Sequence, residues 1–214
     1  MDKISVLKTL KQAREGSQKR NFSQTFDLVI NLKDLDIKKV DNQIEFFMSL
    51  PQGFGKQSKI CALVGPELET EAKNTCDRTI LIHEFDKLDK IAIKKLAEEH
   101  RFFIAQATIM PKVAQYFGRV LGPRAKMPNP KSGCVVPPKV NLKPLYDKLQ
   151  KTVKISTKTS TIIQIPVGIE SMSDDAVVEN VIAAYDQIVA QMPGHDNNIR
   201  SMMLKLTMGK PARF

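Results

Sequence analysis

The stretch Ile60-Cys61-Ala62-Leu63-Val64 is an unbroken apolar run that ends at a Gly-Pro pair. Two further apolar runs follow it, Thr79 to Ile82 and Phe102 to Ala105, and helix-like stretches lie between the runs. Short, wholly apolar strands that alternate with helices are typical of a parallel sheet covered on both faces. We therefore predict that residues 60–152 form a Rossmann-like parallel α/β domain.

The sequence on either side of this region has a different pattern. Residues 26–32, 44–50 and 201–208 place apolar side chains at every second position. This alternation predicts strands with one buried face and one face in solvent, as in an antiparallel sheet. The two flanks are therefore expected to form a sheet of another kind than the middle.

Two amphipathic helices are predicted in the flanks. Residues 2–15 place apolar side chains at helical spacing behind Asp2, a candidate cap. The second helix follows Ser173, which is expected to cap it. The predicted apolar stripe of the first helix consists of Ile4, Leu7, Leu10 and Ala13.

Neither flank has enough strands for independent stability. We therefore predict a mixed α/β chain in which residues 1–59 plus 153–214 form a discontinuous α+β domain with a split β-α-β type antiparallel sheet. Residues 60–152 would be inserted into it. On this division, the discontinuous domain is the expected RNA-binding part.

The chain has 214 residues, and 33 Lys and Arg against 23 Asp and Glu give a formal net charge of +10. Such an excess predicts a polyanionic partner. The basic residues are densest between Lys112 and Lys151, whereas residues 153–214 contain as many acidic as basic residues. Charge alone would therefore place the polyanion on the middle domain.

The most unusual basic stretch is Gly118 to Gly133. Its density of Pro and Gly predicts irregular backbone. It is either a long surface loop with solvated charge or a secondary basic loop that contacts RNA. The candidate contacts are Arg119, Arg124, Lys126 and Lys131.

The residues do not predict a metal, a cofactor or a catalytic site. Cys61, Cys76 and Cys134 lack the spacing of a zinc site or a disulfide framework, so we expect buried or spare thiols. Only Gly65 follows the first apolar run, where a dinucleotide fingerprint needs three glycines. No apolar run reaches the ~18 residues of a membrane span, and no signal peptide is recognisable, so we expect a cytoplasmic protein.

Two segments at strand ends carry side chains that suit RNA. The Thr207 hydroxyl can donate to and accept from a ribose hydroxyl, and Gly209 permits a positive φ and a close backbone approach. Arg20 is placed to contact phosphate, and Phe22 is either a core residue or exposed for stacking on a base or sugar. On these residues alone, both segments could also be ordinary turns.

Four motifs occur along the chain, Asn21-Phe22-Ser23-Gln24-Thr25-Phe26-Asp27, Leu50-Pro51-x-Gly53-x-Gly55-Lys56, Leu121-Gly122-Pro123-Arg124-x-Lys126-Met127-Pro128 and Lys205-Leu206-Thr207-Met208-Gly209. In this order they resemble the large-subunit ribosomal protein L1 family, of archaeal or eukaryotic type. The resemblance covers essentially the whole chain. It implies a two-domain protein without a cofactor, monomeric when free.

The resemblance also implies a function. The split domain would bind large-subunit rRNA at the mobile stalk beside the tRNA exit site and assist release of deacylated tRNA from there. It would also repress translation by binding the protein's own mRNA. The RNA-contacting positions that the resemblance implies are Phe22, Thr25, Asp27, Ser201, Thr207, Met208 and Gly209.

Three further residues complete the predicted site. Met203 and Lys205 share the polar side of the last strand with Ser201, and Arg20 adjoins Phe22. Replacing Thr207 by Val is expected to weaken RNA binding with little change in stability.

Two other functions remain open from the residues alone. The βαβ pattern of the middle domain is compatible with an α/β enzyme that acts on nucleotides. Alternatively, the basic segment 112–151 could dock an acidic protein.

Overall fold

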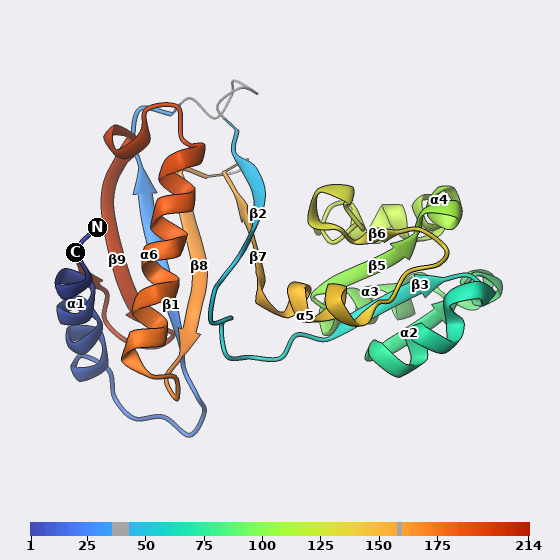
Figure 1. The fold of residues 1–214 in the computed structure, drawn as a ribbon, viewed down its shortest axis with the longest axis horizontal. Helices are drawn as coiled ribbons and strands as arrows, with labels where there is room; N and C mark the ends of the chain where they lie inside the picture. Colours follow the sequence, from blue (N-terminus) through green and yellow to red (C-terminus); the bar gives the residue numbers. More distant parts are fainter. Residues whose placement is uncertain (36–42, 158–159) are drawn as a thin grey trace. The chain divides into compact units, whose positions relative to one another are not determined.

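The computed structural model describes residues 1–35, 43–157 and 160–214. These residues form two compact units, Met1–Lys56 with Lys151–Phe214 and Gln57–Gln150. The first contains an antiparallel sheet and the second a parallel sheet (Figure 1). The mixed α/β class is therefore confirmed, with both predicted kinds of sheet.

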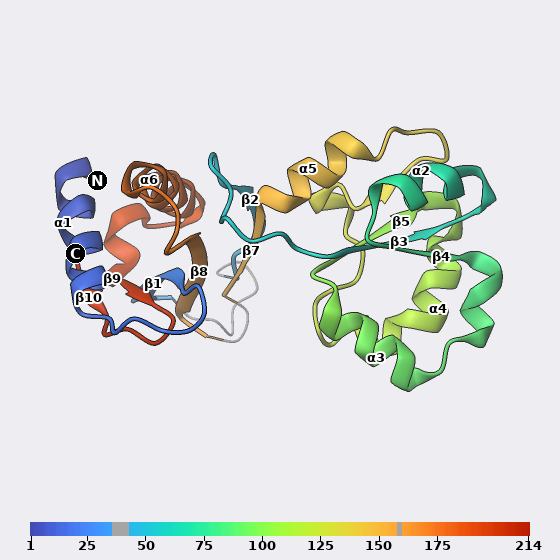
Figure 2. The same cartoon turned by 90° about the horizontal axis from the view of Figure 1, so that it is seen from below.

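The first unit is built on a four-stranded antiparallel sheet with strand order β10-β9-β1-β8. Helices α1 and α6 lie against one face of this sheet (Figures 1 and 2). A two-stranded antiparallel pair, β2 with β7, completes the unit. The elements are α1 (Lys3–Glu15), β1 (Thr25–Leu32), β2 (Glu45–Ser49), β7 (Thr152–Ser156), β8 (Ile162–Ile169), α6 (Asp174–Gln191), β9 (Ile199–Leu206) and β10 (Ala212–Arg213).

Burial alternates along the strands as the sequence predicts. In β1, the side chains of Phe26, Leu28 and Ile30 are fully buried, while the residues between them are partly exposed. In β9, Met202, Leu204 and Leu206 face the helices. The alternation works because successive side chains of a strand point to opposite faces, and only one face is covered.

The apolar stripe of α1 differs from the prediction. Ile4 is 81% exposed, and the buried residues are Val6, Thr9, Leu10 and Ala13. The stripe is set by what the helix packs against, which is α6 together with β9 and β10. Neither Asp2 nor Ser173 makes the side-chain cap bond that was expected of it.

A buried amide holds the turn that follows β2. Asn180 of α6 is fully buried, and its Nδ2 donates to the carbonyls of Gly53 (2.5 Å) and Val167 (2.8 Å). Its Oδ1 accepts from the backbone N–H of Gln52 (3.1 Å). Gly53 and Gly55 have φ of 65° and 75°, which other residues rarely adopt. The Leu-Pro-x-Gly-x-Gly motif is thus a structural turn.

The second unit is a four-stranded parallel sheet with strand order β4-β3-β5-β6. Helices α2 and α5 cover one face, and α3 and α4 cover the other (Figure 2). Every residue of β3 and β5 is buried, as expected for strands between two helical layers. The elements are β3 (Ile60–Val64), α2 (Glu69–Thr75), β4 (Arg78–Leu81), α3 (Lys90–Glu99), β5 (Phe102–Gln106), α4 (Met110–Leu121), β6 (Val135–Val136) and α5 (Lys143–Lys151), with short 3-10 turns at Pro66–Leu68, Ile82–Lys87, Ala107–Ile109, Pro130–Ser132 and, in the first unit, His195–Asn198.

The Gly- and Pro-rich stretch is more regular than predicted. Its first four residues, 118–121, are the last turn of α4, and Pro130–Ser132 forms a 3-10 turn. The helix continues through Gly118 because one glycine in a helix costs only about 1 kcal/mol, and the first proline of the stretch is Pro123.

Candidate nucleic-acid interface

The face of the antiparallel sheet opposite α1 and α6 is uncovered within its unit, and we call it the open face. Asp27, Val29 and Asn31 of β1 lie on it. Opposite them on β9 are Lys205, Met203 and Ser201, and opposite them on β8 are Pro166, Gln164 and Ile162. Five of the predicted contact residues belong to this face, Thr25, Asp27, Ser201, Met203 and Lys205.

Asp27 is the carboxylate of the open face. Partial burial raises its pKa above the usual value, and the positive charge of Lys205 partly offsets this shift. Burial therefore makes the ionised carboxylate less favourable than it is in water. Asp27 lies directly opposite Lys205 on the neighbouring strand. A carboxylate there accepts from base amino groups or ribose hydroxyls and discriminates against generic phosphate.

Thr207 joins the end of β9 to the start of β1. Its Oγ1 accepts from the backbone N–H of Thr25 (3.1 Å) and donates to the Thr25 carbonyl (3.3 Å). The hydroxyl retains one lone pair for an RNA donor. The sequence predicts little change in stability on replacement by Val, but the substitution also removes the bonds to Thr25, so we expect it to lower stability as well.

Gln24 positions the Thr-Met-Gly turn, and sequence reasoning missed this role. The side chain is fully buried, and its Oε1 accepts from the backbone N–H of Met208 (3.1 Å). Its Nε2 donates to Ser17 Oγ (3.1 Å) and to the Gln18 carbonyl (3.3 Å). In the sequence, Gln24 is a polar residue directly before a strand of alternating pattern. Only the fold shows that its side chain is buried.

Two large apolar side chains next to this link are exposed, Phe22 by 51% and Met208 by 61%. Phe22 is thus not a core residue. With Arg20 and Glu170 it lines an open pocket of ≈ 390 Å³, which also includes Lys19, Asn21, Ser23 and Ser171. An exposed aromatic ring beside cations suits a stacked base or sugar next to phosphate.

Of the two properties expected of Gly209, a positive φ and a close backbone approach, the first is wrong. It does not have a positive φ. A Cβ at this position would lie 3.2 Å from the Cβ atoms of Leu206 and Ser17, closer than side chains normally pack. The glycine therefore allows the turn to lie against the segment that leads to Gln24.

Two of the four candidate side chains in the basic stretch of the second unit bind backbone carbonyls of the same unit. Lys126 Nζ donates to the carbonyls of Ala97 (2.5 Å) and His100 (2.8 Å), at the C-terminal end of α3. Arg124 donates to the Lys94 carbonyl (3.2 Å) and pairs with Glu98 Oε1 (3.0 Å). Cations at a helix C-terminus satisfy its last carbonyls and complement its dipole. Arg119 and Lys131 are exposed.

The position where a parallel sheet would receive a nucleotide is occupied by side chains of the chain itself. The Gly65 N–H at the end of β3 donates to Gln106 Oε1 (2.9 Å), and Gln106 Nε2 donates to Glu67 (3.2 Å). That N–H is one of the groups a pyrophosphate would need. The geometry gives the nucleotide-enzyme alternative no support.

The three cysteines are buried free thiols, as expected. Burial raises the pKa of Cys61 to about 12 and that of Cys76 to about 11, which keeps both thiols protonated and unreactive. Within the described ranges, no group of three His, Cys, Asp or Glu side chains is arranged to hold a metal ion. None of the described helices combines the length and apolar character needed to cross a bilayer.

Comparison with known proteins gives one consistent match. Residues 10–210 match the model of the "Ribosomal protein L1p/L10e family". Three archaeal relatives are each named large ribosomal subunit protein uL1. The one from Nanoarchaeum equitans is 41% identical over 95% of this chain and 96% of the relative. The one from Methanothermococcus thermolithotrophicus is 41% identical over 100% and 99%, and that from Pyrococcus horikoshii 37% over 99% and 96%.

Proposed function

The chain belongs to the Ribosomal protein L1p/L10e family, and on that premise we propose that it is a structural, non-catalytic constituent of the large ribosomal subunit. It binds large-subunit rRNA through its discontinuous unit, using the open face and the adjoining segments 20–25 and 207–209. It is located in the cytoplasm, as part of the ribosome.

One observation carries the placement of the site. Segments that are about 180 residues apart in the sequence are joined at one end of the open face by the Thr207–Thr25 and Met208–Gln24 hydrogen bonds. This link places a hydroxyl, a carboxylate and two exposed apolar side chains on one surface. RNA recognition uses such a combination of ribose contacts, base-edge contacts and stacking.

We extend the proposal to the finer role that the family resemblance implies. The rRNA site is the mobile stalk beside the tRNA exit site, where the protein transiently contacts deacylated tRNA and assists its release. The same surface represses translation by binding a similar structure on the protein's own mRNA. The free protein is a monomer, and one surface of it serves both RNAs in turn.

The test is to replace Thr207 by Val and measure affinity for a large-subunit rRNA fragment by filter binding at fixed salt. Loss of one hydroxyl contact should weaken binding by about 2- to 10-fold, equivalent to about 0.5–1.5 kcal/mol. The free energy of unfolding should fall by a similar amount because the bond to Thr25 is lost. Affinity is therefore compared at a temperature where both proteins are fully folded.

The matched control is Thr70→Val, the same chemical change at an exposed position of α2 in the second unit. It should leave rRNA affinity unchanged. Equal affinities of the wild type and Thr207→Val would contradict the proposed site. For the mRNA role, Thr207→Val should weaken binding of the protein's own mRNA by the same factor as rRNA, and unequal factors would argue against one shared surface.

A further inference from the structure

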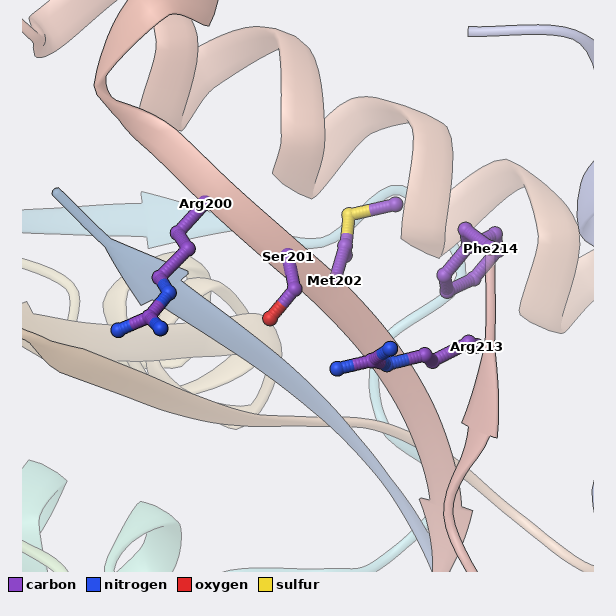
Figure 3. Close-up of a pocket in the computed structure, with 5 residues that line it drawn as sticks. All are labelled: Arg200, Ser201, Met202, Arg213 and Phe214. Carbon is purple, nitrogen blue, oxygen red and sulfur yellow. The ribbon is translucent and has the colours of Figure 1, made fainter.

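Beyond the predicted contacts, the open face contains a pocket that sequence reasoning did not identify. It has a volume of ≈ 270 Å³ and is lined by Arg200, Ser201, Met202, Arg213 and Phe214. Figure 3 shows the guanidinium groups of Arg200 and Arg213 on either side of the Ser201 hydroxyl, with Met202 directed away toward α6. Two cations and a hydroxyl thus line one pocket (Figure 3).

A β-bulge brings Arg200 into this group. Asn31 of β1 is opposite Ser201, but the next residue of β1, Leu32, is opposite Ile199, so Arg200 is an extra residue in β9. In a regular strand, neighbours point to opposite faces, and Arg200 would face the helices. A bulge redirects the side chain, and Arg200 is exposed on the same side as Ser201.

Arg213 reaches the pocket from the neighbouring strand. It lies on β10 opposite Met203, which is on the open face, whereas Ala212 is opposite the buried Leu204. Neither Arg213 nor Arg200 has an ion pair or a side-chain hydrogen bond with any described residue. Within the described part of the chain, both guanidinium groups are thus without a side-chain partner, as a site for an anion requires.

The Ser201 hydroxyl is oriented as a donor. Asn31 Nδ2 donates to Ser201 Oγ (2.8 Å), so one lone pair is used and the hydroxyl hydrogen points elsewhere. Two planar guanidinium groups and a hydroxyl donor match the oxygens of a phosphate group. The described strand residues of the open face include three cations, Arg200, Lys205 and Arg213. They include one carboxylate, that of Asp27.

We propose that this pocket binds a backbone phosphodiester of the RNA that occupies the open face. The proposal rests on the proposed function, since it extends the same interface from the Thr207–Gly209 turn along β9 to the β10 edge. The pocket adds affinity and fixes the register of the RNA, because phosphate contacts position a nucleic acid and base contacts specify it.

The experiment compares the full-length wild type with Arg200→Gln, Arg213→Gln and the double variant, measuring rRNA-fragment affinity as a function of KCl concentration. Because the pocket would hold one phosphate, the double variant should reduce the slope of log affinity against log salt by about 0.7–0.9, and neither single variant should reduce it by more. Arg213→Lys should keep the slope, because it keeps the charge. Arg78→Gln, an exposed arginine on β4, should not change the slope.

The outcomes separate the two proposals. A wild type that does not select the rRNA fragment over a scrambled sequence overturns the proposed function. Selective binding with an unchanged slope in the double variant overturns only the phosphate pocket, provided that its unfolding midpoint equals that of the wild type. In NMR titrations, the side-chain signals of both arginines should shift with the rRNA fragment. Shifts with inorganic phosphate but not with RNA would overturn the assignment.

Discussion

The two sheets of this protein differ in how many of their faces helices cover. Basic side chains of the two units, two from each, differ as well, in whether they bind backbone carbonyls or are exposed without such a bond. The parallel sheet of the second unit lies between two layers of helices, and β3 and β5 are entirely buried. The antiparallel sheet of the first unit is covered on one face only within that unit. In the second unit, Arg124 and Lys126 donate hydrogen bonds to backbone carbonyls in α3 or at its C-terminal end. Arg200 and Arg213 on the open face make no side-chain hydrogen bond with a described residue.

This contrast separates the density of basic residues along the sequence from the position of the proposed binding site. The densest basic segment, 112–151, belongs except for Lys151 to the unit in which helices cover both faces of the sheet (Figure 2). The segment 153–214 has no net charge, yet Arg200, Lys205 and Arg213 lie on the open face while most of its acidic residues lie on α6 or near its ends. The open face is cationic because basic side chains point toward it, and not because the segment contains an excess of them.

The largest expected effect tests the coverage of the sheets directly. Val64→Thr in β3 and Val29→Thr in β1 make the same substitution at nearly constant volume. Val64 is fully buried between layers, so its hydroxyl should cost about 1–3 kcal/mol of unfolding free energy. Val29 is partly exposed on the open face, so its cost should be below about 0.5 kcal/mol. Urea unfolding of both variants measures the difference, and equal losses would contradict the contrast.

The second effect concerns the basic residues of the second unit. Lys126→Met keeps most of the side-chain length but leaves the Ala97 and His100 carbonyls without their cationic donor. It should lower the unfolding free energy by about 1–2 kcal/mol and leave rRNA affinity unchanged. The control is Lys131→Met, at an exposed lysine nearby, which should change neither. A loss of rRNA affinity in Lys126→Met at full folding would instead give this stretch an RNA-binding role.

The smallest effect is the pH dependence due to Asp27. Its folded-state pKa is above the usual 3.8, so the folded state binds this proton more tightly than the unfolded state does. Ionised Asp27 therefore costs stability above its folded-state pKa, and the cost disappears below its unfolded-state pKa. Asp27→Asn should stabilise the protein at pH 7 relative to the wild type, and this advantage should vanish near pH 3. The measurement is the urea midpoint of each protein at both pH values. A difference in midpoint between variant and wild type that is the same at pH 7 and pH 3 would refute the prediction.

Much of the fold could be predicted because it is encoded in local patterns. The unbroken run at Ile60–Val64 and the alternation in residues 26–32 led to the two kinds of sheet. The stripe of α1 could not be predicted fully, since Ile4 is apolar but faces away from α6. The Gly118–Leu121 turn of α4 was hidden by the prolines that follow it.

The arrangement of the candidate site could be predicted only in part. The resemblance led to residues such as Thr25 and Thr207, and the alternation of β9 added Met203 and Lys205. Gln24 could not be recognised as an internal link, because its partners Ser17 and Met208 are brought together only by folding. Arg200 was assigned to no face, since a bulge depends on how β9 pairs with β1.

By itself, the sequence determined the two kinds of sheet, the amphipathic helices and the polyanionic class of partner. These follow from the period of apolar residues and from composition, which need no knowledge of neighbours. The tertiary structure alone decided which cations support their own backbone and which are free to bind. That choice depends on strand register, on one bulge and on long-range hydrogen bonds, and none of these is a property of a short stretch of sequence.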